Sequence, residues 1–589
     1  MTVTSNHVVP LDGSLALGRE VVGNKGASIG AMLALGLPVP PAFALPIDEC
    51  RRYHAAGGVL ADDVWEAVLG SIASLERETG RRLGDPEESL LVSVRSGAAV
   101  SMPGMMDTIL NLGMTDEVEA GMGRRARDSE FARATHVRFC HEFGHTVLGA
   151  DLDPPGAGAT ARDVRAAVLA DTGHAVPEEP LEQLRAAIKA VFGSWSSRRA
   201  IAYRKHWGIP EDGGTAVIVQ AMVFGNLAER SGTGVLFTRD PLTGEPEPYG
   251  EWLPGGQGED VVSGTHDCLE LAALKDAMPD VGERLVDAGR LLEQTNGDVQ
   301  DIEFTVERGR LYLLQTRAAK RSPLAAVRIA VDLATEGAIS RDVALQRVSV
   351  DQLALVLAPR LPAAVAETAE VLARGTPACP GVASGRVVHD SDAAEAAAGD
   401  VVLVRPTTSP DDVAGMIAAT AIVTERGGST SHAAVVSRAL GRPSVVGVGA
   451  GVTAAFGDRE ITVDGSAGVV YAGALDTEAV EVADVPRLED LVAWAREISP
   501  VEVLDHAPEV VDVQPIGVGL AEGAPADPDL LAEQLRGAPA ARGALLATAE
   551  GAEAVLRSGV PTVVRTADQH AATLLLRLVQ ARSPSEEKR

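Results

Sequence analysis

The spacing of hydrophobic and polar positions changes along the chain and predicts four parts. Residues 1–320 mix β-branched runs bounded by glycine, such as 215–225, with amphipathic helical segments. Residues 321–377 are rich in Ala and Leu, have few turn signals, and predict a helical linker. Residues 378–480 predict a compact, Val-rich α/β domain, and residues 481–589 predict a linker helix with a small α/β tail. The pattern therefore indicates a multidomain protein of mixed α/β and α+β class.

Two apolar runs near residue 310 predict a β-hairpin. Strand alternation places Asp301 and Glu303 on the same side of the first run. We expect Gln315 and Arg317 of the second run to join them on that face. Glu303 can lie opposite Gln315 in a regular hairpin only if the loop holds an odd number of residues, such as the three residues 308–310.

Composition and charge narrow the function classes. The 589 residues are long enough for several domains, and 46% are hydrophobic, as in ordinary globular proteins. The formal net charge of −30 disfavours nucleic acid and anionic membranes as partners, so an anionic ligand needs a local cationic pocket. The N-terminal residues have no signal-peptide pattern, and the four cysteines lie far apart, so we expect reduced thiols in the cytoplasm.

A loop of glycine and hydroxyl residues precedes His432. An apolar strand ends near Thr424, Gly427 and Gly428 follow, and three hydroxyl residues lead to a helical run that starts at or just after His432. Backbone N–H groups and the positive end of a helix favour an anion there. A neutral imidazole at that position can attack a phosphoryl group. Taken alone, the pattern also fits a surface histidine, which is the commoner case.

Two further segments offer cations to phosphate. Lys25 lies among glycines before a helical run at 23–30, which is also compatible with an ordinary turn. Arg95 follows a predicted strand, and Gly104 lies in a Pro-Gly turn whose backbone can approach a ligand closely.

These motifs together resemble the pyruvate phosphate dikinases, which are PEP-utilising enzymes. The resemblance rests on TSHAAVV at 430–436, on SVRSGAAVSMPGMMDT at 93–108 and on segments up to LQTRAAKR at 314–321, and it extends over about 15–500. It implies an ATP-grasp domain over 1–320 and a swivelling phosphohistidine domain over 378–480. It also implies that His432 carries the β-phosphate of ATP and that Thr430 is a possible regulatory phosphorylation site.

The resemblance also implies an ATP site and its Mg²⁺ ligands. Glu303 and Gln315 are the implied metal ligands, which agrees with the preference of Mg²⁺ for oxygen. Gln220 and Met222 are expected along the adenine. The remaining implied ATP-binding residues are Lys25, Arg95, Gly104, Arg138, Thr233, Glu251, Glu259, Asp260, Asp301 and Arg317. The chain departs from the family pattern at Asn24, usually glycine, and at Ser429, usually a bulkier apolar residue.

The segment HEFGH at 141–145 fits a zinc-protease pattern, but we reject that interpretation. Gly144 weakens the helix that the motif needs, no third ligand is evident, and the surrounding sequence follows the dikinases.

The resemblance ends near Val503, which raises the question of the phosphate acceptor. A (β/α)₈ barrel needs about 250 residues, and 86 follow Val503, none of them cysteine. We therefore expect a truncated or replaced barrel, no barrel-mediated homodimer, and an acceptor that is either pyruvate on a separate barrel protein or another small molecule. A phosphocarrier or regulatory subunit remains an alternative. An inactive nucleotide-binding relative is disfavoured because Lys25, Glu303 and His432 are all retained.

Overall fold

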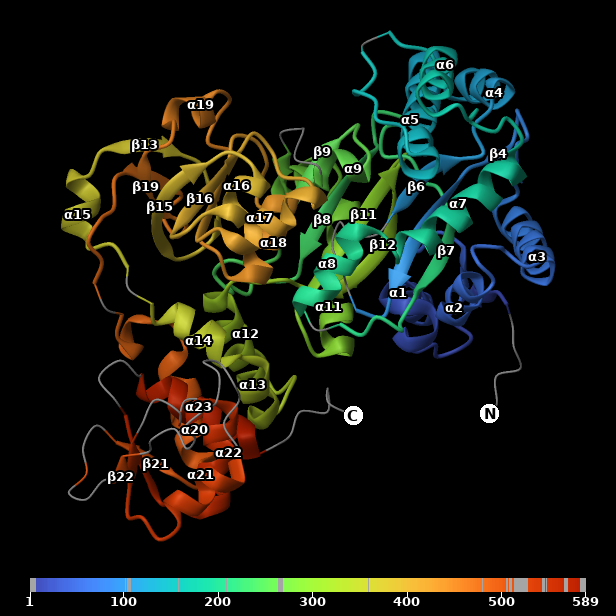
Figure 1. The fold of residues 1–589 in the computed structure, drawn as a ribbon. Helices are drawn as coiled ribbons and strands as arrows, with labels where there is room; N and C mark the ends of the chain where they lie inside the picture. The colour runs from blue at the N-terminus through green and yellow to red at the C-terminus, as the bar shows by residue number, and fades with distance from the viewer. Residues whose placement is uncertain are drawn as a thin grey trace.

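The fold is described from a computed structural model, in which an ATP-grasp-type domain, a mobile-type domain and a C-terminal domain surround a helical base (Figure 1). The structure describes residues 7–582 except 101, 103–106, 157, 208, 263–267, 359, 479, 505–506, 508–510, 513–527, 543–545, 547 and 566–569.

The first domain begins with a five-stranded sheet. Its strand order is β1-β2-β7-β5-β6, and each neighbouring pair is antiparallel. The strands are β1 (Val9–Leu11), β2 (Ala42–Leu45), β7 (Thr215–Ala221), β5 (Val92–Ala98) and β6 (Thr108–Leu112). A separate two-stranded sheet joins β3 (Arg82–Leu83) and β4 (Ser89–Leu90). The helices of this part are α1 (Arg19–Ala34), α2 (Ile47–Ala55), α3 (Asp62–Thr79), α4 (Asp116–Ala126), α5 (Ser129–Leu148), α6 (Ala161–Thr172), α7 (Pro180–Ser194) and α8 (Arg198–Trp207).

A second five-stranded sheet completes this domain. Its order is β10-β9-β8-β11-β12, again antiparallel. The strands are β10 (Leu269–Glu270), β9 (Tyr249–Pro254), β8 (Gly232–Phe237), β11 (Gln300–Glu307) and β12 (Arg310–Ala318), and the helices are α9 (Gly258–Val262), α10 (Leu271–Ala277) and α11 (Pro279–Asn296). Helix α1 contacts β5 and β7 of the first sheet and β12 of the second. Two sheets joined in this way form the ATP-grasp architecture expected for the first part of the chain.

The hairpin of β11 and β12 confirms the predicted pairing but corrects its loop. Asp301 lies opposite Arg317, and Glu303 lies opposite Gln315. The loop holds two residues, Arg308 and Gly309, with φ values of 51° and 77°, as in a type I′ turn. The register shifts between Glu303 and Phe304, because β12 contains one extra residue there. This extra residue lets Glu303 lie opposite Gln315 even though the loop has two residues and not three.

Four helices follow and lead to the mobile-type domain. They are α12 (Pro323–Thr335), α13 (Arg341–Arg347), α14 (Val350–Val356) and α15 (Ala363–Thr368). The first helices pack with α20 (Leu488–Ile498) and the terminal helix α23 (Ala571–Arg582) around one core that includes Val327, Leu345, Leu491 and Leu575. Both connections of the mobile-type domain therefore start from the same helical base.

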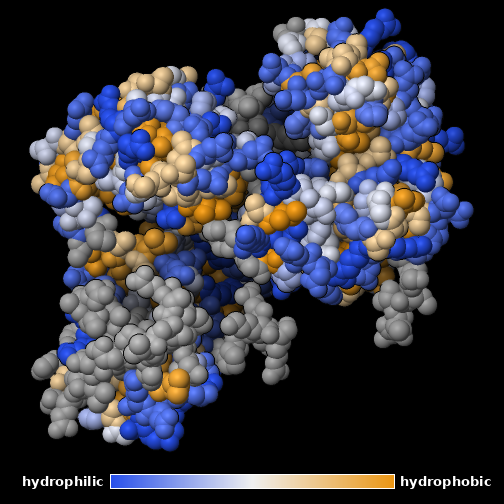
Figure 2. Space-filling model, in the orientation of Figure 1, coloured by the Kyte–Doolittle hydropathy of each residue, from blue (hydrophilic) through white to orange (hydrophobic). Residues whose placement is uncertain are grey.

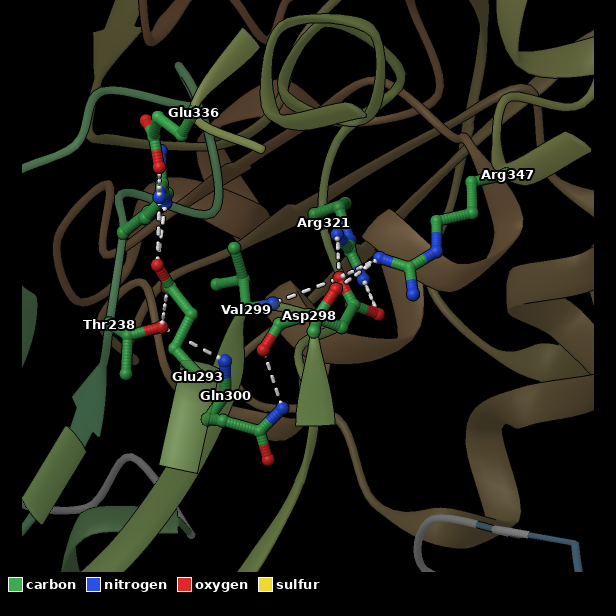
Figure 3. Close-up of polar contacts among 10 residues, drawn as sticks. Thr238, Glu293, Asp298, Val299, Gln300, Arg321, Glu336 and Arg347 are labelled. Carbon is green, nitrogen blue, oxygen red and sulfur yellow. Dashed lines mark hydrogen bonds and ion pairs between the residues drawn. The ribbon is translucent and has the colours of Figure 1, made fainter. Parts of the chain in front are cut away.

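Partly buried ion pairs join this base to the ATP-grasp-type domain (Figure 3). Arg239 follows β8 and pairs with Glu293 of α11 at 2.8 Å and with Glu336, just after α12, at 2.6 Å. Asp298 pairs with Arg321 at 2.8 Å and with Arg347 of α13 at 3.4 Å. Burial alone would raise the pKa of Asp298, but the two arginines lower it overall. Paired and hydrogen-bonded charges of this kind fix the orientation of the linker.

The mobile-type domain is built on an eight-stranded mixed sheet. Its order is β13-β20-β19-β15-β16-β17-β18-β14, and the run from β15 to β18 is parallel. The strands are β13 (Val371–Arg374), β14 (Thr376–Cys379), β15 (Val382–Val388), β16 (Val401–Arg405), β17 (Ala421–Thr424), β18 (Ser444–Val446), β19 (Glu460–Asp464) and β20 (Val469–Ala472). The helices are α16 (Ser391–Ala396), α17 (Val413–Ala418), α18 (His432–Leu440) and α19 (Val452–Phe456), and short 3₁₀ turns cover Pro410–Asp412 and Val482–Asp484.

One boundary of this domain was predicted wrongly. The sequence assigned residues up to 377 to the helical linker, yet β13 and the first half of β14 precede residue 378 and belong to the sheet. Both are edge strands, and their short length gives no clear period-2 signal.

The described part of the C-terminal domain contains four parallel strands in the order β21-β24-β23-β22. They are β21 (Glu502–Leu504), β22 (Val511–Asp512), β23 (Ala541–Arg542) and β24 (Thr562–Val564), alternating with α21 (Pro528–Leu535) and α22 (Ala549–Ser558). The predicted βα units are therefore present in this part of the chain.

The visible surface of the protein is largely hydrophilic, with small apolar patches (Figure 2), as the acidic composition indicates. No helix in the described ranges has the length and apolar character needed to cross a membrane.

Candidate nucleotide and phosphohistidine site

Glu303 and Gln315 form the centre of the first candidate site. Their side chains meet across the hairpin, where Gln315 Nε2 donates to Glu303 Oε1 at 2.6 Å. Arg95 lies on β5 of the first sheet. Its Nη2 donates to Glu303 Oε2 at 3.1 Å and to Gln315 Oε1 at 3.4 Å. Burial alone would raise the pKa of Glu303, but Arg95, Arg317 and Lys25 lower it overall. The carboxyl group is thus held as an anion among cations.

Asp301 and Arg317 form the next pair along the same face. Arg317 Nε donates to Asp301 Oδ2 at 2.7 Å, and Asp301 is 2% exposed. Burial raises the pKa of Asp301 despite the opposing effect of Arg317. Asp301 Oδ1 is buried without a hydrogen-bond partner. The pair anchors Arg317 beside Glu303 and leaves one carboxylate oxygen unpaired.

Lys25 enters the site from a kink in α1. Gly23 has a φ of 69° inside the helix, and a Cβ there would lie 1.7 Å from the carbonyl oxygen of Gly97 in β5. Only glycine permits both the left-handed backbone and the close approach. Lys25 follows two residues later, where burial and the charges of Arg95 and Arg317 lower its pKa to about 7, against a smaller opposing effect of Glu303.

The lowered pKa of Lys25 predicts a pH-dependent affinity for MgATP. An anion favours the ammonium form, so binding takes up a proton when Lys25 is neutral beforehand. We expect affinity to be highest below pH 7 and to weaken above it by up to about tenfold per pH unit. Calorimetry in buffers of different ionisation enthalpy should show this uptake in the wild type and not in Lys25→Arg. An affinity that does not change between pH 6 and 9 would contradict this role.

The residues expected to hold Mg²⁺ fit that ion. Glu303 Oε2 and Gln315 Oε1 both lie within hydrogen-bond distance of Arg95 Nη2, and oxygen ligands from one or two side chains suit Mg²⁺, which usually takes the rest from phosphates and water. No group of three or more His, Cys, Asp or Glu side chains in the described residues is arranged to hold a metal.

The other expected ATP-binding residues that the structure describes make the following contacts. Arg138 of α5 pairs with Asp260 of α9 at 2.7 Å. The Thr233 hydroxyl donates to the carbonyl of Phe304 at 3.0 Å. Gln220 is buried, and its Nε2 donates to the carbonyl of Pro40 at 3.2 Å, while the Met222 N–H donates to the carbonyl of Leu91 at 2.9 Å. Gly104 and the side chain of Glu259 lie outside the described residues.

The second candidate site is the start of α18 in the mobile-type domain. The helix begins at His432, as predicted, and the hydroxyl of Ser431 accepts from the N–H of Ala434 as its N-cap. His432 Nδ1 lies 3.1 Å from Thr408 Oγ1, and Nε2 is buried without a partner. Burial lowers the pKa of His432 against a smaller opposing effect of Asp412. In the tautomer that donates Nδ1–H to Thr408, the neutral ring presents the Nε2 lone pair for phosphoryl attack.

The hydroxyl beside the ring comes from outside the loop that precedes His432. Within that loop, Ser431 caps the helix and the Thr430 hydroxyl donates to Glu251 Oε2. The residue at the ring is Thr408, which follows β16, the parallel neighbour of β17. The ends of adjacent parallel strands meet at one edge of a sheet. The segment after the strand at 401–405 could therefore have been predicted to lie beside His432.

The two candidate sites are linked through Glu251 on β9. Glu251 pairs with Val235, and Val235 pairs with Glu303, so Glu251 lies in the same transverse row as Glu303 and Gln315. Directly paired residues share one face of a sheet. The loop before His432 therefore contacts the sheet face that presents Glu303 and Gln315. Glu251 and Glu303 are two strands apart on this face.

The structure of α5 supports the rejection of the zinc-protease interpretation. His141 Nε2 lies 3.3 Å from the carbonyl oxygen of Leu152, and His145 Nδ1 lies 3.0 Å from that of Ala150. Both rings are thus used in local contacts with the backbone.

Comparison with known families agrees with this geometry. Residues 58–277 match the family model "Pyruvate phosphate dikinase, AMP/ATP-binding domain", and residues 397–468 match "PEP-utilising enzyme, mobile domain". Both matched domains make this chain similar to PEP-utilising enzymes, and in particular to the pyruvate, phosphate dikinases.

Individual relatives support the same relationship. A pyruvate, phosphate dikinase of Clostridium symbiosum is 40% identical over 528 residues, which are 83% of this chain and 60% of the relative. A chloroplastic pyruvate, phosphate dikinase of Oryza sativa is 44% identical over 458 residues, which are 73% of this chain and 48% of the relative. One from Arabidopsis thaliana is 40% identical over 528 residues, covering 83% and 54%. The chain thus spans about half to three-fifths of these relatives.

Proposed function

We propose that this protein is an ATP-dependent phosphotransferase that places phosphate on His432 and passes it to an acceptor. The observation that carries this proposal is the contact of Glu251 with Ser429 and Thr430. It holds the loop before His432 against the sheet face that presents Glu303 and Gln315. A phosphate donor site and a nucleophilic histidine then belong to one functional unit.

The residues of the first site would bind the nucleotide by offsetting its charge. Lys25, Arg95 and Arg317 surround the anionic Glu303 and would contact phosphate oxygens. Glu303 and Gln315 would hold Mg²⁺ together with the phosphates, and the ion would supply further positive charge to the group being transferred. His432 Nε2 would form the new N–P bond as the P–O bond to the departing part of the nucleotide breaks.

The final acceptor is proposed from the relatives. Pyruvate is the substrate in their names, and we infer that pyruvate bound by a separate barrel protein, or another small molecule, discharges His432. The described C-terminal strands form a four-stranded parallel sheet, and this architecture differs from a closed eight-stranded barrel. We also propose a cytoplasmic setting, because Cys50, Cys140, Cys268 and Cys379 are free thiols and persistent disulfides are typical of oxidising compartments.

The 589-residue polypeptide should acquire acid-labile phosphate from β-labelled ATP but form no phosphoenolpyruvate from ATP, phosphate and pyruvate. The reason is that the described C-terminal strands form a four-stranded parallel sheet, which differs from the barrel that the enolate chemistry would need. The measurement is protein-bound label together with a coupled assay for phosphoenolpyruvate. A mixture with a separate barrel protein should complete the reaction, and a panel of small molecules should identify other acceptors by loss of label. Steady phosphoenolpyruvate formation by this polypeptide alone would contradict the acceptor proposal, and no label at all would contradict the transferase proposal.

A further inference from the structure

We propose that Ser429 and Tyr249 form an interdomain latch with Glu251 that positions the mobile domain for phosphoryl transfer. This inference rests on the proposed function, because the latch would serve the step in which His432 receives phosphate. Tyr249 and Glu251 belong to β9 of the ATP-grasp-type domain, whereas Ser429 lies three residues before His432. Figure 1 shows the mobile-type domain beside β8 and β9 in this arrangement.

The hydrogen bonds of the latch have one consistent direction. The Ser429 hydroxyl donates to Glu251 Oε1 at 2.8 Å, which uses its single proton. The Tyr249 hydroxyl therefore donates to the Ser429 oxygen. Thr430 donates to the other carboxylate oxygen, Glu251 Oε2. Two hydroxyls from the mobile-type domain thus satisfy both oxygens of one carboxylate on the other domain.

The latch residues of the mobile-type domain are buried, whereas Tyr249 and Glu251 on β9 are half-buried. Ser429 is 1% exposed and Thr430 is 4% exposed. Gly428 brings the loop so close that a Cβ there would lie 2.6 Å from Glu251 Oε1. Arg438 of α18 is also buried, and Tyr249, Asp301 and Glu251 oppose the lowering of its pKa by burial. A cation of the mobile-type domain therefore lies near the acidic residues of the sheet.

Ser429 is the residue on which both other side chains of the latch depend. An apolar side chain at this position could neither accept from Tyr249 nor donate to Glu251. Removing the Ser429 hydroxyl would leave the Tyr249 hydroxyl and Glu251 Oε1 without these partners in a partly buried interface. Unpaired buried polar groups are unfavourable, so the docked arrangement would lose population.

The test is a double-mutant cycle on single-turnover labelling of His432 at saturating MgATP. Ser429→Ala and Tyr249→Phe should each slow labelling by about tenfold, and the double variant should be no slower than the slower single one, because both remove the same contact. The dissociation constant for MgATP should stay within twofold of the wild type. Ser384→Ala is the matched control, since Ser384 bonds Thr462 inside the mobile-type domain at 2.8 Å, and it should label at the wild-type rate.

A second measurement does not depend on activity. Amide hydrogen exchange over residues 427–436 should speed up by about tenfold in Ser429→Ala, while residues 460–472 remain unchanged. Independent, multiplicative effects of the two substitutions on labelling, or unchanged exchange over 427–436, would overturn the latch and leave the transferase proposal standing. If the wild type takes up no label, the transferase proposal fails, and the exchange measurement alone decides whether the latch holds the domains together.

Discussion

Replacing His432 with alanine is expected to abolish labelling of the protein by β-labelled ATP. The change removes the nitrogen that would form the bond to phosphorus, and no other side chain in the described residues around α18 offers a buried imidazole without a partner at Nε2. Affinity for MgATP should remain within about twofold, because the cationic cluster of Lys25, Arg95 and Arg317 lies in the other domain. The measurements are acid-labile label on the protein and calorimetric titration with MgATP.

A histidine of the same domain provides the control for this variant. His389 follows β15 and is partly exposed, so His389→Ala should retain labelling. Acid-labile label in His432→Ala at the wild-type level would identify another residue as the carrier. Loss of MgATP binding in that variant would instead mean that the two sites are not separable.

Glu303→Gln is expected to reduce the rate of His432 labelling by at least about a hundredfold, equivalent to roughly 3 kcal/mol. The amide keeps the size of the side chain but removes the negative charge that would bind Mg²⁺. It also leaves Arg95, Arg317 and Lys25 without the anion that they now surround. The rate should be measured over a range of Mg²⁺ concentrations, where a weakened metal site predicts partial recovery at high concentration.

The control for Glu303 is a glutamate that is exposed on α11. Glu283→Gln makes the same chemical change away from the site and should label normally. The thermal midpoint of each variant shows whether the fold is retained. A labelling rate for Glu303→Gln within threefold of the wild type would exclude Glu303 as a metal ligand.

The sequence predicted the features that arise from neighbouring residues. Alternation in β11 indicated that Asp301 and Glu303 share a face, and the pairing with Arg317 and Gln315 is confirmed. The start of α18 at His432 followed from the glycines and hydroxyls before an apolar helical run, and Ser431 is indeed the cap. Such signals are local because strand periodicity and helix caps involve residues within a turn or two of one another.

Only the tertiary structure decided which distant segments meet. The hairpin loop has two residues, because an extra residue on β12 supplies the change of register. Hydrophobic alternation is equally compatible with this arrangement and with a three-residue loop. Thr408 lies beside His432 because two parallel strands end at one edge of the sheet. Glu251, expected at the nucleotide by resemblance, contacts Ser429 and Thr430 because the mobile-type domain lies against β9. These contacts join residues 24 to 179 positions apart, and their formation depends on the packing of whole domains, which no local pattern encodes.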